Sequence, residues 1–365
     1  MNKFSYFFLF LLLVFCDKTF AQDDGIRVIA YYAGDAKKID NYPVEKLTHI
    51  IFSFSHLKGN QLHIDNANDE ATIKKLVSLK KKNPELKVIL SLGGWGGCKT
   101  CSDVFTLADD RKVFAESVKD LLEKYDADGI DLDWEYPAIE GFPGHTYKPE
   151  DKQNFTQLVK QLREKLGQKY EISFAAGGFQ KFIDESVEWE EVMKEVNYVN
   201  LMSYDLVNGY ATTTGHHTPL YSTPQQPILS VDWGVTQLIN KGVPKNKIII
   251  GAAFYGREWE NVPDSNFGLY QPGKFKTSIN ITKIDQIITA KDGFVYHWDD
   301  VAKAPYLYDS VKHLFLTYDN KRSIELKTKY AVDKGLGGIM FWELGLDAYK
   351  NGLLQVIDET KKNYK

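Results

Sequence analysis

Short apolar runs recur along the chain, and most are followed by a segment in which apolar residues return every three or four positions. Short runs are typical of buried strands, and the longer periodic segments are typical of helices packed on one face. Eight strand units that alternate with helices predict an α/β chain folded as a (β/α)8 TIM barrel. The expected strands are 26–32, 48–55, 87–92, 129–134, 170–176, 198–203, 248–254 and 338–342. The clearest expected helices are 69–82, 109–125, 149–166, 186–196, 231–241 and 321–333.

The fourth expected strand carries a row of acids. Residues 128–136 read Asp-Gly-Ile-Asp-Leu-Asp-Trp-Glu-Tyr, and from Ile130 onward apolar and acidic residues alternate. Asp131, Asp133 and Glu135 therefore share one face of the strand. A parallel sheet is usually covered on both faces, and ionised groups buried without partners cost several kcal/mol each. Such a row indicates shared protons or chemistry, and Glu135, nearest the carboxyl end of the strand, is the expected general acid.

The same stretch resembles the signature of an enzyme family. Asp128, Asp131, Asp133 and Glu135 match the Asp-x-x-Asp-x-Asp-x-Glu motif of the family 18 glycoside hydrolases, the chitinase family. The resemblance implies that Glu135 protonates the leaving oxygen, and later acts as base toward water, while the N-acetyl carbonyl of the substrate attacks the anomeric carbon. It further implies that Asp133 stabilises the oxazolinium-like intermediate, that Asp131 tunes Asp133, and that Tyr204 positions the acetamide. Asp128 has the opposite strand parity and is expected to be structural.

Aromatic and polar residues gather where the expected strands end, and in a barrel these ends converge on the face that carries active sites. Residues 91–95 read Ser-Leu-Gly-Gly-Trp and residues 202–205 read Met-Ser-Tyr-Asp, which resemble the third-strand and sixth-strand motifs of family 18. Trp342 resembles the tryptophan that forms the floor of the site in that family. Rings beside hydrogen-bonding groups suit the apolar faces and polar edges of sugars. The expected substrate-binding residues are Tyr31, Phe54, Trp95, Tyr136, Met202, Asp205, Arg257, Trp298 and Trp342.

The stretch between the seventh and eighth expected strands is too long for an ordinary connection. Residues 258–319 are rich in aromatic side chains and are expected to form a small α+β insertion with its own apolar core. Its position on the active-site face suggests a wall beside the substrate groove, as in family members whose insertion deepens the cleft. The resemblance there implies exo-type or processive cutting, and the sequence leaves endo action equally open. Residues 22–365 as a whole are expected to form one catalytic domain.

The first residues predict export. Residues 1–21 contain an early lysine, an apolar core and a Thr-Phe-Ala ending, which is typical of a secretory signal peptide cleaved before Gln22. Because the apolar core is too short to span a membrane, the mature chain is expected to be secreted or periplasmic. A lipid-modified Cys16 is the less favoured alternative, since Phe15 is bulky where a small residue is expected. The formal net charge is −4 and the sequence has no basic clusters, so no nucleic-acid binding is expected.

The other two cysteines, Cys98 and Cys101, are spaced Cys-x-x-Cys without a second pair that could complete a zinc site. In an exported chain they are expected to form a local disulfide. His145, His216 and His217 lie in expected loops without a third ligand at metal spacing, and the acids have the spacing of a strand rather than of a calcium loop. No metal is therefore expected, and the mechanism that the resemblance implies requires neither a metal nor an organic cofactor.

Three functions are compatible with these patterns. The first is a secreted chitinase that cuts β-1,4-linked N-acetylglucosamine, with chitin or its oligosaccharides as the partner. The second is an endo-β-N-acetylglucosaminidase that acts on N-glycans with the same acids. The third is a chitin-binding lectin on the same barrel, and it is disfavoured because Glu135, Asp133 and Tyr204 are all present. No protein partner is evident, and a monomer is expected.

Overall fold

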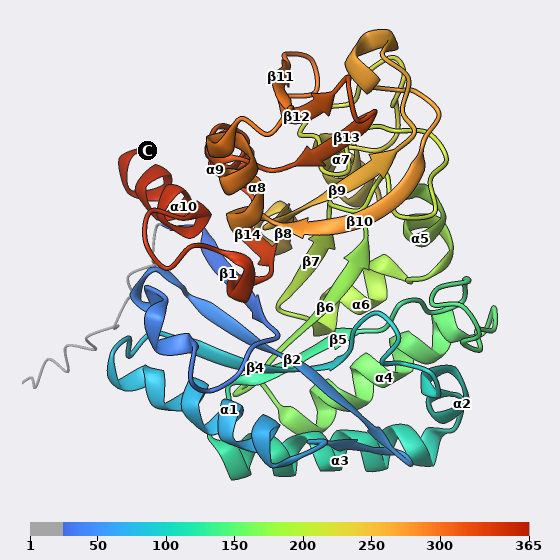
Figure 1. Ribbon diagram of the computed structural model, residues 1–365. Coiled ribbons are helices and arrows are strands. Elements are labelled where there is room, and N and C mark those ends of the chain that lie inside the picture. The colour runs from blue at the N-terminus through green and yellow to red at the C-terminus, as the bar shows by residue number, and fades with distance from the viewer. Residues whose placement is uncertain (1–24, 365) are drawn as a thin grey trace, which may run out of the picture.

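The computed structural model describes residues 25–364, in which eight parallel strands close into a barrel (Figure 1). The strands follow one another in the order β1-β14-β8-β7-β6-β5-β4-β2, and β2 pairs with β1 to complete the ring. The expected (β/α)8 barrel is confirmed, and the acidic row begins on β5, the fourth barrel strand along the chain. The barrel strands are β1 (Arg27–Tyr32), β2 (His49–Lys58), β4 (Lys87–Gly93), β5 (Gly129–Asp133), β6 (Glu171–Gly177), β7 (Tyr198–Met202), β8 (Ile248–Ala253) and β14 (Gly338–Trp342).

Helices cover the outside of the barrel, because alternate residues of each strand face them. On β1, Val28 and Ala30 pack in the large core beneath the helices, while Ile29 and Tyr31 point into the barrel and form a second, smaller core. The expected helix 186–196 begins later than expected, at Trp189, because a separate short helix ends just before it. The helices around the barrel are α1 (Ala67–Ser78), α2 (Cys101–Thr106), α3 (Ala108–Tyr125), α4 (Asp151–Leu166), α5 (Gln180–Glu185), α6 (Trp189–Glu195), α7 (Val231–Asn240), α9 (Lys321–Asp333) and α10 (Leu353–Asn363).

A second sheet lies between β8 and α9 in the chain and stands above one end of the barrel in Figure 1. It is antiparallel, with the order β10-β9-β13-β12-β11, and its first strand begins at Tyr255, three residues before the expected boundary at 258. Trp259 and Phe315 are fully buried in a core of its own. Because β9 follows directly after β8, this sheet stands at the carboxyl ends of the barrel strands. Its elements are β9 (Tyr255–Glu260), β10 (Lys274–Asn280), α8 (Ile281–Ala290), β11 (Val295–Asp299), β12 (Ala304–Asp309) and β13 (Leu314–Tyr318).

The amino-terminal predictions lie outside the described residues. These are the signal peptide 1–21 and the alternative lipid site at Cys16, and both stay predictions. Within residues 25–364, no helix is both long enough and apolar enough to cross a membrane.

Candidate active site

The acidic row lies inside the barrel, at the carboxyl end of β5. Asp131 and Asp133 belong to the strand and Glu135 follows it, and their exposed fractions are 0%, 4% and 9%. Exposure therefore increases toward the carboxyl end, where a substrate would arrive. Gly93 allows β4 to lie close beside this row, because its φ is +107° and a Cβ atom there would collide with the Asp133 carbonyl oxygen.

Asp131 is the best satisfied of the three acids. Its Oδ2 accepts hydrogen bonds from the hydroxyls of Tyr31 at 3.0 Å and Ser91 at 2.9 Å. Its Oδ1 accepts from Ser173 at 2.7 Å and from the Asn200 amide at 3.2 Å. Complete burial raises the pKa of Asp131, and these hydrogen bonds oppose the rise. Four other barrel strands thus hold one carboxylate at the centre of the barrel.

Asp133 and Glu135 share the burial without those hydrogen bonds. Asp133 Oδ1 has no hydrogen-bond partner within residues 25–364. Burial, with the charges of Glu135 and Asp131, holds the pKa of Asp133 well above its usual range. Burial also raises the pKa of Glu135 to about 7. The charge of Asp205 adds to this rise, and a hydrogen bond with Tyr136 opposes it. A carboxyl with such a pKa can carry a proton near neutral pH and deliver it as a general acid.

Tyr204 and Asp205 follow β7 and face the same space. Burial and the charges of Asp133 and Glu135 raise the pKa of the Tyr204 hydroxyl. Arg257 donates to both carboxylate oxygens of Asp205, with its Nε 2.5 Å from Oδ1. The Nδ1 of His217, a fully buried ring, lies 3.5 Å from the same Oδ1. Although burial alone would raise the pKa of Asp205, His217 and Arg257 hold it well below its usual range, so this residue stays ionised.

An aromatic floor lies beside the acids. The half-buried Trp342 stacks on Phe54, with ring centroids 5.6 Å apart and an interplanar angle of 14°. Tyr31 approaches the same indole at 5.9 Å. Met202 is half-buried and packs, with Tyr204 and Trp342, against the apolar residues that fill the barrel. Four of the expected substrate-binding residues thus converge on one surface together with Tyr204.

A second group of aromatic residues forms an edge farther out. Trp95 is 48% exposed, and its ring lies 6.4 Å from Tyr136 and 5.5 Å from Phe142. Tyr136 directly follows Glu135 and packs against Phe179 at 5.4 Å. These rings extend the aromatic surface from the acids toward solvent, as apolar contacts for successive sugars would require.

Trp298 lies in a different neighbourhood from the other expected binding residues. It belongs to β11, the edge strand of the second sheet, and the guanidinium of Arg322 lies 3.9 Å from its ring centroid. Its indole nitrogen donates to Asp300 at 3.0 Å, and the side chain lines a pocket of about 460 Å³ with Phe267 and His297. Because none of these contacts is with the acidic row, its role in substrate binding stays a prediction.

The cysteine pair and Asp128 have structural contacts. Cys98, in the loop that follows β4, and Cys101, the first residue of α2, are joined by a disulfide, with 5.2 Å between their Cα atoms. Asp128 accepts a hydrogen bond from the Val88 amide at 2.7 Å and pairs with Lys80 at 2.8 Å. Among the described residues, no group of three or more histidine, cysteine or acidic side chains is arranged to hold a metal ion.

Sequence reasoning did not single out Ser173, Asn200 and His217 as parts of the site. A signal for the first two exists, because both are polar residues inside strands that are otherwise apolar. Ser173 pairs directly with Asp131 in the register between β5 and β6. His217 carries no comparable signal, since its place beside Asp205 depends on how a long connection folds back.

Comparisons with known proteins agree with this geometry. Residues 27–347 match the model of the glycosyl hydrolases family 18. The chain is 36% identical to chitinase A1 of Niallia circulans over 301 residues, which are 76% of this chain and 43% of that protein. It is 30% identical to chitotriosidase-1 of Mus musculus over 323 residues, which are 83% of this chain and 68% of that protein. The solved structure of a glycoside hydrolase family 18 N-acetylglucosaminidase from Paenibacillus barengoltzii matches with a TM-score of 0.84 and 37% identity, over 92% of this chain and 99% of that one.

The match extends over the whole barrel and the acidic row, although the chain spans less than half the length of chitinase A1. The residues that carry the resemblance, from Asp128 to Glu135, form the buried row at the centre of the barrel. On this combined evidence of motif, fold and family match, the chain belongs to family 18 of the glycosyl hydrolases.

Proposed function

We propose that this protein is a chitinase, which hydrolyses the β-1,4 linkages between N-acetylglucosamine residues with retention of configuration. The observation that carries the proposal is the buried acid pair. Glu135 lies two residues beyond Asp133 at the accessible end of the row, and burial raises its pKa to about 7. Two of the relatives described above are named as a chitinase and a chitotriosidase, which supports chitin oligosaccharides as the substrate.

In this mechanism Glu135 gives its proton to the glycosidic oxygen, and the acetamide oxygen of the substrate attacks the anomeric carbon as the bond from that carbon to the glycosidic oxygen breaks. Glu135 then takes a proton from the water that opens the intermediate and completes the hydrolysis. Retaining glycosidases ordinarily use a second carboxylate as the nucleophile, and family 18 is an exception that relies on the substrate. Asp205, the carboxylate contributed by another strand, is held by Arg257 and is therefore poorly suited to attack. Asp133 can bond the acetamide, because its Oδ1 is not engaged by other described residues, and in its ionised form it would stabilise the positive charge that forms there. The Tyr204 hydroxyl would then orient the acetamide.

A second candidate is the release of single N-acetylglucosamine units from chain ends. The protein from Paenibacillus barengoltzii, which is 37% identical, is named an N-acetylglucosaminidase. Both activities would use the same acids, so they differ in the size of the product and not in the chemistry. The N-glycan activity and the lectin function are separated from these two by the same experiment.

The test compares residues 22–365 with a Glu135→Gln variant on chitin oligosaccharides and on an N-glycosylated protein, with products resolved by mass. Oligosaccharide cleavage that disappears in the variant while binding persists is the expected result. A Glu140→Gln variant is the control, since Glu140 is an exposed glutamate in the loop after β5 and should keep full activity. Release of glycans alone would replace the proposal with an endo-β-N-acetylglucosaminidase, and binding without turnover would leave a lectin.

We also propose that the protein is exported and monomeric. Residues 1–21 have the pattern of a secretory signal peptide, which supports export. Expression of the full chain followed by intact mass measurement should give a product that begins at Gln22. A mass that includes a lipid at Cys16 would support the lipoprotein alternative instead. Light scattering of the mature protein should give the molar mass of a single chain.

A further inference from the structure

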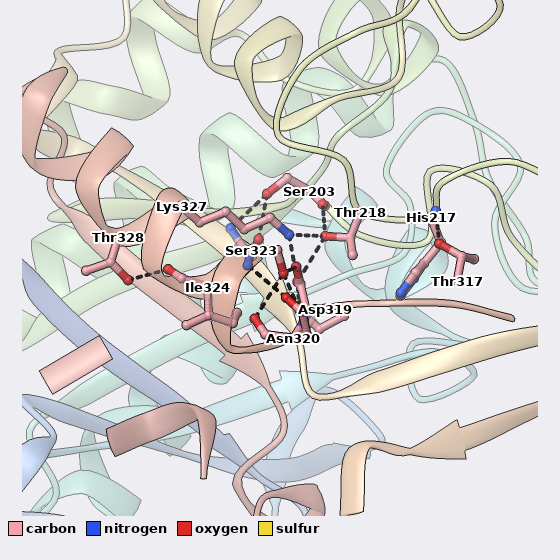
Figure 2. A network of polar contacts seen from close by, with 12 residues as sticks. Ser203, His217, Thr218, Thr317, Asp319, Asn320, Ser323, Ile324, Lys327 and Thr328 are labelled. Atoms are coloured by element: carbon pink, nitrogen blue, oxygen red, sulfur yellow. Dashed lines mark hydrogen bonds and ion pairs between the residues drawn. The ribbon is translucent and has the colours of Figure 1, made fainter. Parts of the chain in front are cut away.

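A fully buried ion pair lies outside the acidic row, where the second sheet returns to the barrel (Figure 2). Lys327 Nζ and Asp319 Oδ2 are 2.6 Å apart, and both side chains have an exposed fraction of 0%. Taking two charges out of water is unfavourable, and removing one partner leaves the other without compensation. A pair of this kind therefore fixes the segments that contribute to it with respect to one another.

Asp319 connects the insertion to the barrel. It follows β13, the last strand of the second sheet, and its Oδ2 accepts a hydrogen bond from the amide of Ala253, the last residue of β8, at 3.1 Å. Its Oδ1 accepts from the Ser323 hydroxyl in the first turn of α9 at 2.6 Å. Lys327 lies one turn farther along the same helix. The carboxylate is thus bound by two barrel elements on either side of the insertion.

The network continues from Lys327 to the connection between β7 and α7. Lys327 Nζ donates to the Thr218 hydroxyl at 2.6 Å, and that hydroxyl donates to the carbonyl oxygen of Ser203 at 3.0 Å. The Ser203 hydroxyl in turn accepts from the Gly251 amide at 2.9 Å and donates to the Gly251 carbonyl at 3.0 Å. Figure 2 shows Ser203 and Thr218 side by side, with the lysine nitrogen and Asp319 next to them.

The stretch 203–218 carries site residues close to both of its ends. Tyr204 and Asp205 follow Ser203 directly, and His217, which precedes Thr218, lies beside Asp205. The Leu206 amide donates to the His217 carbonyl at 3.0 Å, which joins the two ends. Asp205 has a φ of +55°, a conformation that persists in non-glycine residues when the surroundings hold it. The hydrogen bonds that join Lys327, Thr218 and Ser203 constrain the backbone next to Asp205 in this way.

We propose that the ion pair of Asp319 and Lys327, acting through Thr218, positions Tyr204 and Asp205 against the acidic row. The three residues are positioning residues and do not touch the substrate. The inference rests on the proposed function, because it concerns how the hydrolytic site is assembled. Catalytic groups must be held within a fraction of an ångström, and a displacement of about 1 Å costs roughly a hundredfold in rate.

A matched pair of threonine variants tests the proposal. Thr218→Val removes the hydroxyl that joins Lys327 to Ser203. Thr328→Val removes a similarly buried hydroxyl whose single hydrogen bond within residues 25–364 is to the Ile324 carbonyl in α9. Both changes replace a buried hydroxyl with a methyl group, and Thr218→Val also takes one acceptor from Lys327, so it is expected to lower stability somewhat more. Thr218→Val is expected to lower kcat on chitin oligosaccharides at least tenfold, and Thr328→Val less than twofold. Thr218→Ser restores the hydroxyl and should recover most of the rate.

The pH dependence of kcat/KM separates a positioning role from a loss of stability, because a loss of stability alone would not shift it. The Asp205 charge raises the pKa of Glu135, so a displaced Asp205 should move the alkaline limb of kcat/KM to lower pH in Thr218→Val. Lys327→Met should do the same with a larger loss of kcat. Unchanged kcat and pH profiles in Thr218→Val beside an active unmodified protein would overturn this inference alone. An inactive unmodified protein would overturn the proposed function and, with it, the inference.

Discussion

Replacing Glu135 with glutamine should stabilise the protein at alkaline pH and leave its stability nearly unchanged at acidic pH. Burial is the first cause of the raised pKa of Glu135, which moves from the ordinary value of 4.5 to about 7. Each pKa unit corresponds to about 1.4 kcal/mol, so ionising this side chain costs about 3 kcal/mol more in the folded protein than in the unfolded chain. Glutamine has nearly the same shape and never ionises.

The direction of the effect follows from which state binds the proton. Below pH 4.5 the carboxyl is protonated in both states, and its contribution to stability is complete. Between pH 4.5 and about 7 the unfolded chain ionises while the folded protein keeps its proton, so the free energy of unfolding decreases as pH rises. Above about 7 the loss levels off at about 3 kcal/mol, and the Glu135→Gln variant avoids it.

The assay is guanidinium denaturation of both proteins at pH 4 and pH 9, with the free energy of unfolding taken from the midpoint and a shared slope. At pH 9 the gain of about 3 kcal/mol corresponds to a melting temperature roughly 4 °C higher, given about 2.1 cal/mol/K per residue for a chain of this length. Glu140→Gln makes the same change on the surface and should give no gain at either pH. An equal gain at both pH values, or destabilisation at pH 9, would refute the argument from burial.

The pH dependence of hydrolysis, the aromatic floor and the disulfide give three more predictions. The kcat/KM value should fall above about pH 7 as Glu135 loses its proton. Asp205→Asn should move this alkaline fall to lower pH, because the charge of Asp205 raises the pKa of Glu135. A fall that stays at the same pH would contradict the electrostatic coupling between Asp205 and Glu135. Trp342→Ala should raise KM for chitin oligosaccharides about tenfold through lost stacking, and an unchanged KM would remove Trp342 from the site. Replacing Cys98 and Cys101 with serine should lower the free energy of unfolding by about 2 kcal/mol, because the disulfide closes only a short loop. Denaturation under oxidising conditions measures this last change, and a loss of activity without a loss of stability would contradict it.

The barrel could be predicted because its strands are buried on both faces. The run 248–254 illustrates this, since it is almost entirely apolar and follows the turn residues Pro244 and Asn246, and β8 occupies Ile248–Ala253. The acidic row was equally visible, because a period of two on a strand fixes which side chains share a face. Both signals are local in the sequence, so no knowledge of distant contacts is needed to detect them.

Features that depend on distant parts of the chain were not predictable in the same way. His217 lies in a long connection, and only the folded path brings its ring to Asp205. The buried state of Lys327 was also hidden, because a lysine in an amphipathic helix is ordinarily solvated, and its partner Asp319 comes from another element. Trp298 is an aromatic residue of the insertion whose contacts in the structure are with Arg322 and Asp300, and its role in substrate binding stays a prediction.

The hydrogen bonds to Asp131 explain why the site requires the closed barrel. The four donors, Tyr31, Ser91, Ser173 and Asn200, come from β1, β4, β6 and β7, so the carboxylate is satisfied only when strands from β1 to β7 have come together around it. Asn200 also donates to the Tyr31 hydroxyl at 3.1 Å, which links the donors directly across the barrel. A buried carboxylate that loses such bonds is destabilised by the full cost of its desolvation, and its proton affinity changes with it. The charge of Asp131 raises the pKa of Asp133 in turn, so the contacts at the centre of the barrel influence the acid next to Glu135.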